Sequence, residues 1–134
     1  MDDVEVRRGY FPGAIGRVVE LHGTYYHTHW RFGAFFEAQV ASQLAEFFGG
    51  YDQLRDGFWI ATVSGRVEGA ITIDGAHAAD DGAHLRWFIM SEALRGRGDG
   101  YKEGFQLVLK VRRFEGFSVA GYGSGAGRSD LHIR

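Results

Sequence analysis

Hydrophobic and polar positions divide the chain into short β-prone stretches and longer helical ones. Four stretches of alternating or continuous apolar residues predict β-strands. They are residues 4–8, 58–63, 66–73 and 84–90. Ser64-Gly65 joins the second stretch to the third as a two-residue turn, so we expect a β-hairpin there. A polar, glycine-bearing loop over residues 74–82 precedes the fourth predicted strand.

Two segments between the first strand and the hairpin have the period of a helix. The break Phe11-Pro12-Gly13 precedes the first, whose shared face carries Ile15, Val18, Val19 and His22. In the second segment, Phe36, Val40, Leu44 and Phe47 recur at helical spacing, and Gly49-Gly50 ends the pattern. The same argument predicts a helix over residues 102–113 and a last strand over residues 117–120.

The predicted order is strand, two helices, three strands, helix and strand. We expect one domain over residues 1–134, because the length suits one domain and neither a repeat nor an interdomain linker is visible. The fold class is α+β, with a mixed, mostly antiparallel sheet flanked by helices and one strand–helix–strand crossover.

Composition narrows the function classes. The net charge of −2 favours no nucleic-acid partner, and no run approaches the roughly 18 apolar residues that a membrane span needs. The chain has no cysteine, which excludes disulfides, thiolate metal sites and a cysteine nucleophile. The acidic N-terminus lacks the apolar run of a secretory signal. We therefore expect a cytoplasmic protein.

Residues 95–100, Arg-Gly-Arg-Gly-Asp-Gly, lie between a predicted strand and a predicted helix. Such a glycine-rich turn can aim several backbone N–H groups at a phosphate, at the positive end of the helix dipole. Arg95 and Arg97 would add guanidinium donors. The alternative is an ordinary strand-to-helix turn whose arginines face water.

The motif Arg95-x-x-Gly98-x-Gly100 resembles the acetyl-CoA-binding motif of the GNAT N-acetyltransferases. Residues 10–23 are similar to the opening of the GNAT domains often fused behind MarR-type DNA-binding domains, and residues 36–41 and 58–61 continue the likeness. The resemblance covers residues 4–100, with a family-like core over residues 4–114.

The resemblance implies an enzyme that transfers acetyl from acetyl-CoA directly to an amine. The backbone of Phe88, Ile89 and Met90 would then pair with the pantetheine arm like an added strand. The pyrophosphate would lie against the backbone amides of Gly96, Arg97, Gly98, Asp99 and Gly100, with the Arg95 and Arg97 side chains beside it. The acceptor would be a small-molecule or peptide amine.

Further side chains are candidates for the acceptor site. The resemblance places His27, His29, Trp30 and Arg31 in a loop that lines the acceptor cleft. Glu68 could project from its strand as the general base, or it could face solvent. His22, His27 and His29 lie close together in the sequence near Glu20. Their spacing does not bring three ligands to one point, so we expect no metal site.

The chain departs from the family at two places. Asp99 stands where the family has a small aliphatic residue, and its carboxylate would repel a pyrophosphate. Residues 115–134 are glycine-rich and match none of the family's last helix and strands, as in a truncated or frame-shifted sequence. The alternative function is therefore a catalytically incomplete protein that binds CoA or only self-associates, and a third is an unrelated phosphate-binding module. An incomplete sheet would leave an open edge, so we expect a homo-oligomer.

Overall fold

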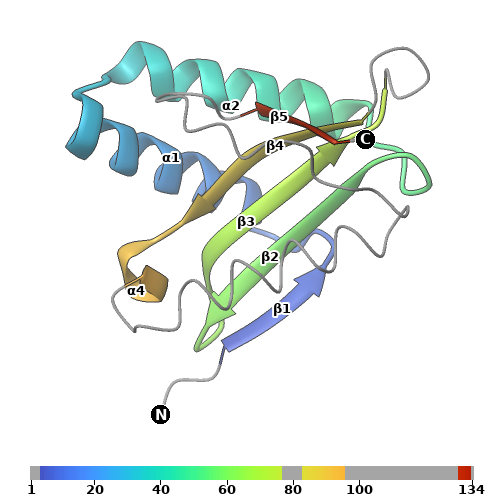
Figure 1. Ribbon diagram of the computed structural model, residues 1–134, viewed down its shortest axis with the longest axis horizontal. Helices are drawn as coiled ribbons and strands as arrows, with labels where there is room; N and C mark the ends of the chain where they lie inside the picture. Colours follow the sequence, from blue (N-terminus) through green and yellow to red (C-terminus); the bar gives the residue numbers. More distant parts are fainter. Residues whose placement is uncertain (1–3, 77–82, 96–129, 134) are drawn as a thin grey trace.

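The computed structural model describes residues 4–76, 83–95 and 130–133 of the chain. In chain order its elements are β1 (Val4–Arg8), α1 (Ala14–Trp30), α2 (Ala34–Gly49), β2 (Gly57–Val63), β3 (Arg66–Asp74), β4 (Ala83–Met90), α4 (Glu92–Arg95) and β5 (Asp130–Ile133). Figure 1 shows α1 and α2 lying side by side along one side of a twisted sheet. This α+β arrangement, with a largely antiparallel sheet flanked by helices, confirms the predicted fold class.

The described strands form one sheet in the order β1-β2-β3-β4-β5, and each neighbouring pair is antiparallel. The predicted hairpin is present as β2 and β3. Its turn residues Ser64 and Gly65 have φ values of 51° and 83°, as a tight turn matched to the twist of the strands requires. The short local link therefore sets the register of the two central strands.

Both predicted helices are confirmed, and their apolar faces pack on the sheet. Val18 and His22 of α1 are buried, as are Val40, Leu44 and Phe47 of α2. These residues form one core with side chains of the three central strands, among them Phe58, Ala70 and Trp87. None of the helices in the described part of the chain is long and apolar enough to cross a membrane.

A second apolar cluster contains no residue of α1 or α2. It consists of sheet side chains such as Trp59, Ile71 and Leu85, together with Leu94 of α4. Successive side chains of a strand point to opposite faces, so these residues cover the face of the sheet that α1 and α2 leave. Leu94 is fully buried there, which anchors the short helix that follows β4.

The end of the chain differs from the sequence-based expectation. The predicted helix at 102–113 and strand at 117–120 lie outside the described residues. The structure instead places β5 at Asp130–Ile133, where the pattern predicted no element, and it adds α4 directly after β4. A strand of four residues is too short for periodicity to reveal, and its pairing with β4 depends on residues more than 40 positions away.

Candidate functional site

The middle of β4 contains a β-bulge. Ala70 pairs with Ile89 and Thr72 pairs with Arg86, so two residues of β4 lie opposite the single residue Ile71 of β3. Trp87, the first of the two, has a φ of 51°, which is uncommon for a residue other than glycine. A bulge of this kind bends a strand and raises its local twist. The direction of β4 therefore changes at Trp87.

Tertiary contacts hold Trp87 in this conformation. Its indole is fully buried and packs 5.5 Å from the Phe47 ring, between centroids. The Arg86 guanidinium carbon lies 4.0 Å from the centroid of the Trp87 ring, and the Thr72 hydroxyl donates a hydrogen bond to the Arg86 carbonyl. Strained backbone of this sort persists only where surrounding contacts over-determine it.

The described residues of β5 pair with the first half of β4. Its register runs from Ala83 opposite Ile133 to Arg86 opposite Asp130. Ile89 and Met90 pair with Ala70 and Gly69 of β3 on the other side. An extended ligand can add to the edge of a strand through main-chain hydrogen bonds.

Ser91 follows this half of β4. Its backbone N–H donates to the Glu68 carbonyl at 2.7 Å, which fixes the end of the strand against β3. Its Oγ is buried and makes no hydrogen bond with the described residues. A buried hydroxyl without a partner marks a place where a ligand or water can bind.

Glu68 is buried and forms an ion pair. The residue is 6% exposed, and Arg17 of α1 donates from Nη2 to its Oε1 at 3.0 Å. Arg17 also donates from Nε to the Val67 carbonyl at 2.8 Å, while Arg66 Nε lies 3.8 Å from Glu68 Oε1. The carboxylate therefore joins α1 to β3. The solvent-facing alternative for Glu68 is wrong, and its use as a base stays a prediction.

The structure places His27, His29 and Trp30 on the last turn of α1, where all three are exposed, so their expected position in a loop is wrong. His27 Nδ1 lies 3.0 Å from the Phe32 carbonyl oxygen, and the His29 ring lies 4.4 Å from that of Tyr25, between centroids. Arg31 ends the helix in the left-handed conformation. Their proposed contact with an acceptor stays a prediction. His22 is buried inside the core instead, and the described residues contain no group of three or more potential metal ligands.

Of the expected donor-binding residues, Phe88, Ile89 and Met90 lie on β4, and Arg95 is the last residue of α4. Gly96, Arg97, Gly98, Asp99 and Gly100 lie outside the described residues. The structure therefore describes the strand half of the predicted acetyl-CoA site.

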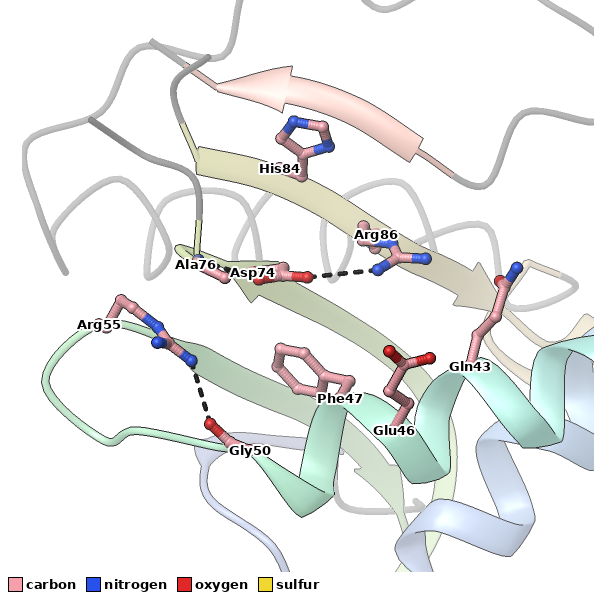
Figure 2. Close-up of a pocket in the computed structure, with 9 residues that line it drawn as sticks. All are labelled: Gln43, Glu46, Phe47, Gly50, Arg55, Asp74, Ala76, His84 and Arg86. Carbon is pink, nitrogen blue, oxygen red and sulfur yellow. Dashed lines mark hydrogen bonds and ion pairs between the residues drawn. The ribbon is translucent and has the colours of Figure 1, made fainter. Parts of the chain in front are cut away.

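An open cavity of about 500 Å³ lies between the second half of α2, the end of β3 and the first half of β4. Figure 2 shows its lining residues: Gln43, Glu46, Phe47, Gly50, Arg55, Asp74, Ala76, His84 and Arg86. Arg86 donates from Nη1 to Asp74 Oδ2 at 3.2 Å, and Arg55 donates from Nη2 to the Gly50 carbonyl at 3.0 Å. The sequence-based reasoning missed this cavity, although the alternation of His84 and Arg86 in β4 places both on one face.

Asp56 supports the wall of this cavity. Its side chain is 1% exposed and accepts hydrogen bonds from Arg55 Nη2 at 2.9 Å and from the Gly75 N–H at 2.8 Å. Burial opposes its charge, but the bonds from Arg55 and from the backbone N–H groups of Asp52 and Gly75 outweigh it and lower the pKa of Asp56. A Cβ at Gly75 would lie 2.3 Å from the Arg55 carbonyl oxygen, so only glycine allows this approach.

No protein-family model and no curated protein matches the chain. Among solved structures, the chain is similar to the crystal structure of an acetyltransferase from Streptococcus agalactiae. The sequence identity is 18%, the TM-score is 0.57, and the match covers 97% of this chain and 95% of that chain. At this identity the likeness concerns the fold, which extends over nearly the whole of both chains. The protein therefore has an α+β fold in common with a known acetyltransferase.

Proposed function

We propose that this protein is an N-acetyltransferase that transfers the acetyl group of acetyl-CoA to an amine. The observation that carries the proposal is β4, which bulges at Trp87 and continues to Met90. An extended pantetheine arm could add to the edge of β4 in the way that a peptide strand adds to a sheet. The shared fold with an acetyltransferase supports the same function.

The described residues fit such a donor. The buried Ser91 hydroxyl at the end of β4 lacks a hydrogen-bond partner among the described residues. We expect the amides of residues 96–100, with Arg95 and Arg97, to hold the pyrophosphate. Acetyl-CoA supplies an acetyl group that is already activated as a thioester. The protein must therefore hold the amine close to it and receive the proton that the amine loses.

A second candidate function is a CoA-binding protein without transferase activity, and the setting of Glu68 favours it. Glu68 is the only general base that the sequence suggested, and its carboxylate is bound by Arg17. The ion pair with Arg17 engages one oxygen of the carboxylate that would have to receive the proton. Self-association and a cytoplasmic location stay predictions under either function.

Acetyl-CoA should raise the melting temperature of the protein, because a ligand that binds only the folded state stabilises it. At ten times its dissociation constant the gain is about 1.4 kcal/mol. Differential scanning fluorimetry with acetyl-CoA up to millimolar concentration measures the shift, with adenosine as a control for nonspecific binding. An unchanged melting temperature would overturn both candidate functions. If a shift appears, release of free thiol with a panel of amines separates a transferase from a binder.

Replacing Asp99 by isoleucine should tighten acetyl-CoA binding, because it removes a negative charge next to the proposed pyrophosphate position. We expect a gain on the order of tenfold in affinity, the scale of one close charge contact near a protein surface. Isothermal titration of both proteins measures it. Asp99→Asn, which removes the charge at constant shape, should give most of the gain. Equal affinities for all three proteins would contradict the repulsion.

A further inference from the structure

We infer that the protein has a second binding site, for a small aromatic molecule that carries one neutral hydrogen-bonding group. The site is an open pocket of about 290 Å³, which we call the aromatic pocket. Most of its lining is aromatic and comes from Tyr10, Phe48, Tyr51 and Phe58. A concave site of about this size, with mostly aromatic walls and a few polar groups, is typical of small-molecule binding.

The aromatic pocket lies apart from the sites described above. Its residues come from the end of β1 and the loop after it, from the end of α2 and the turn that follows, and from the start of β2. None of them lines the cavity of Figure 2, and none belongs to the residues expected to hold acetyl-CoA. The inference is therefore independent of the proposed acetyltransferase function.

Hydrogen bonds hold the walls of the aromatic pocket in place. Arg8 donates from Nη2 to the carbonyls of Gln53 and Asp56, at 2.7 and 3.0 Å. The Gly9 N–H donates to the Phe58 carbonyl at 2.9 Å, and Gly9 has a φ of 117°, which favours glycine. These bonds tie the end of β1 to the turn after α2 and to β2, so the pocket does not depend on a ligand for its shape.

The rings offer both faces and edges to a flat ligand. The Tyr51 ring stacks on the Phe48 ring, with centroids 5.7 Å apart and 20° between the planes. The Phe58 ring meets the Phe48 ring at 90°, with centroids 5.1 Å apart. Tyr10 lies 6.5 Å from Phe48 and is 58% exposed, so its ring keeps surface that a ligand can cover. A further ring can therefore pack here at the spacing of roughly 4.5–7 Å that aromatic pairs prefer.

Two neutral polar groups lie at the same pocket. The Gln53 side-chain amide and the Tyr10 hydroxyl make no hydrogen bond with the described residues. Each group can both donate and accept, so each suits a hydroxyl or a ring N–H on the ligand. A polar group of the ligand then has a partner when it leaves water, which offsets the cost of its burial. An aromatic ring with one such group therefore matches the pocket.

A titration of the isotope-labelled full chain, followed by NMR chemical shifts, measures both the affinity and the place of binding. The probes are phenol, cyclohexanol, toluene and N-acetyltyrosinamide, which carries the phenol ring on a peptide backbone. We expect phenol to shift the amide signals of Gly9, Tyr51 and Gln53. It should bind about fivefold more tightly than cyclohexanol, because aromatic pairs add to the effect of burial. N-acetyltyrosinamide should bind no more tightly than phenol.

Two variants and one matched control test the residues. Tyr10→Ala should weaken phenol binding about fivefold, because it removes one of the rings. Phe35→Ala removes a ring that is 84% exposed and lies outside the pocket, so it should bind phenol like the wild type. The double variant Tyr10→Phe and Gln53→Ala keeps the ring and removes both polar groups. It should weaken phenol about fivefold and leave toluene unaffected. Tyr10, Phe35 and Gln53 are exposed, so the variants should fold, and unchanged melting temperatures check that they do.

Each element of the inference has an outcome that would overturn it. No binding of phenol at millimolar concentration, shifts centred outside the aromatic pocket, or equal affinities of Tyr10→Ala and the wild type would overturn the site. Cyclohexanol binding as tightly as phenol would overturn the aromatic class, and an unchanged phenol affinity in the double variant would overturn the hydrogen-bonding group. Tighter binding of N-acetyltyrosinamide would show that a peptide side chain is the occupant. A melting shift with acetyl-CoA bears on none of these results, so the two proposals fail separately.

Discussion

Replacing Asp56 by alanine is expected to lower the free energy of unfolding by about 2–4 kcal/mol, the cost of leaving buried partners of a charged group unpaired. Asp56 is fully buried and accepts hydrogen bonds from the Gly75 N–H, the Asp52 N–H and the Arg55 guanidinium. Gly75 is buried as well, so its N–H would lose its partner without gaining water. Arg55 is 41% exposed and can be solvated in part, which limits the loss.

Urea denaturation measures this loss, and two variants serve as controls. Asp56→Asn keeps an oxygen that can accept from Gly75, so it should cost less than the alanine variant. Asp52→Ala removes an exposed carboxylate from the same turn, where, among the described residues, it accepts a hydrogen bond only from the Leu54 N–H. It should cost about 1 kcal/mol or less. Equal losses for Asp52→Ala and Asp56→Ala would show that the buried network does not hold β3 to the turn before β2.

The free energy of unfolding should also fall by about 3 kcal/mol as the pH drops from 6.5 to 4, because of His22. The imidazole is fully buried, and this burial lowers the pKa of His22 to about 4, against the opposing effect of its bond with the Val18 carbonyl. Nδ1 lies 2.8 Å from that carbonyl oxygen and donates to it. Nε2 is buried without a hydrogen-bond partner among the described residues, so a proton there would be poorly solvated.

The direction of this change follows from the two pKa values. The unfolded chain takes up a proton near pH 6.5, while the folded protein does so only near pH 4. The contribution of His22 is therefore complete above pH 6.5 and is lost as the pH falls to about 4. Urea midpoints for the wild-type protein and for His22→Phe, measured from pH 7 to pH 4, isolate it from the carboxylates. Parallel curves for wild type and His22→Phe would contradict the buried neutral imidazole.

His22 is an example of a feature that the sequence pattern predicts. Helical spacing with Val18 placed it on the apolar face of the first helix, and the structure confirms that this face is buried. The hairpin was equally predictable, since Ser64-Gly65 is a local signal and its positive φ values are those of a tight turn. In both cases residues within a few positions along the chain determine the local structure.

Glu68 and the cavity are examples of features that the sequence pattern does not predict. The alternating pattern of its strand is compatible with Glu68 facing either a cleft or solvent. The surroundings of Glu68 depend on Arg17, which lies 51 positions earlier in the chain and donates a hydrogen bond to its carboxylate. The cavity brings together Glu46, Arg55, Asp74 and Arg86 from three elements and a turn. Each of these residues is an unremarkable charged residue within its own segment, so the pattern offered no signal for the set.

The order of helices and strands over residues 4–90, and with it the α+β class, follows from the sequence by itself, because hydrophobic period and turn chemistry act between near neighbours. Only the tertiary structure decided the bulge at Trp87, the burial of Asp56 against Gly75 and the cavity beside α2. These features depend on which distant segments pack against each other, and strand pairing and close packing are cooperative properties of the whole fold.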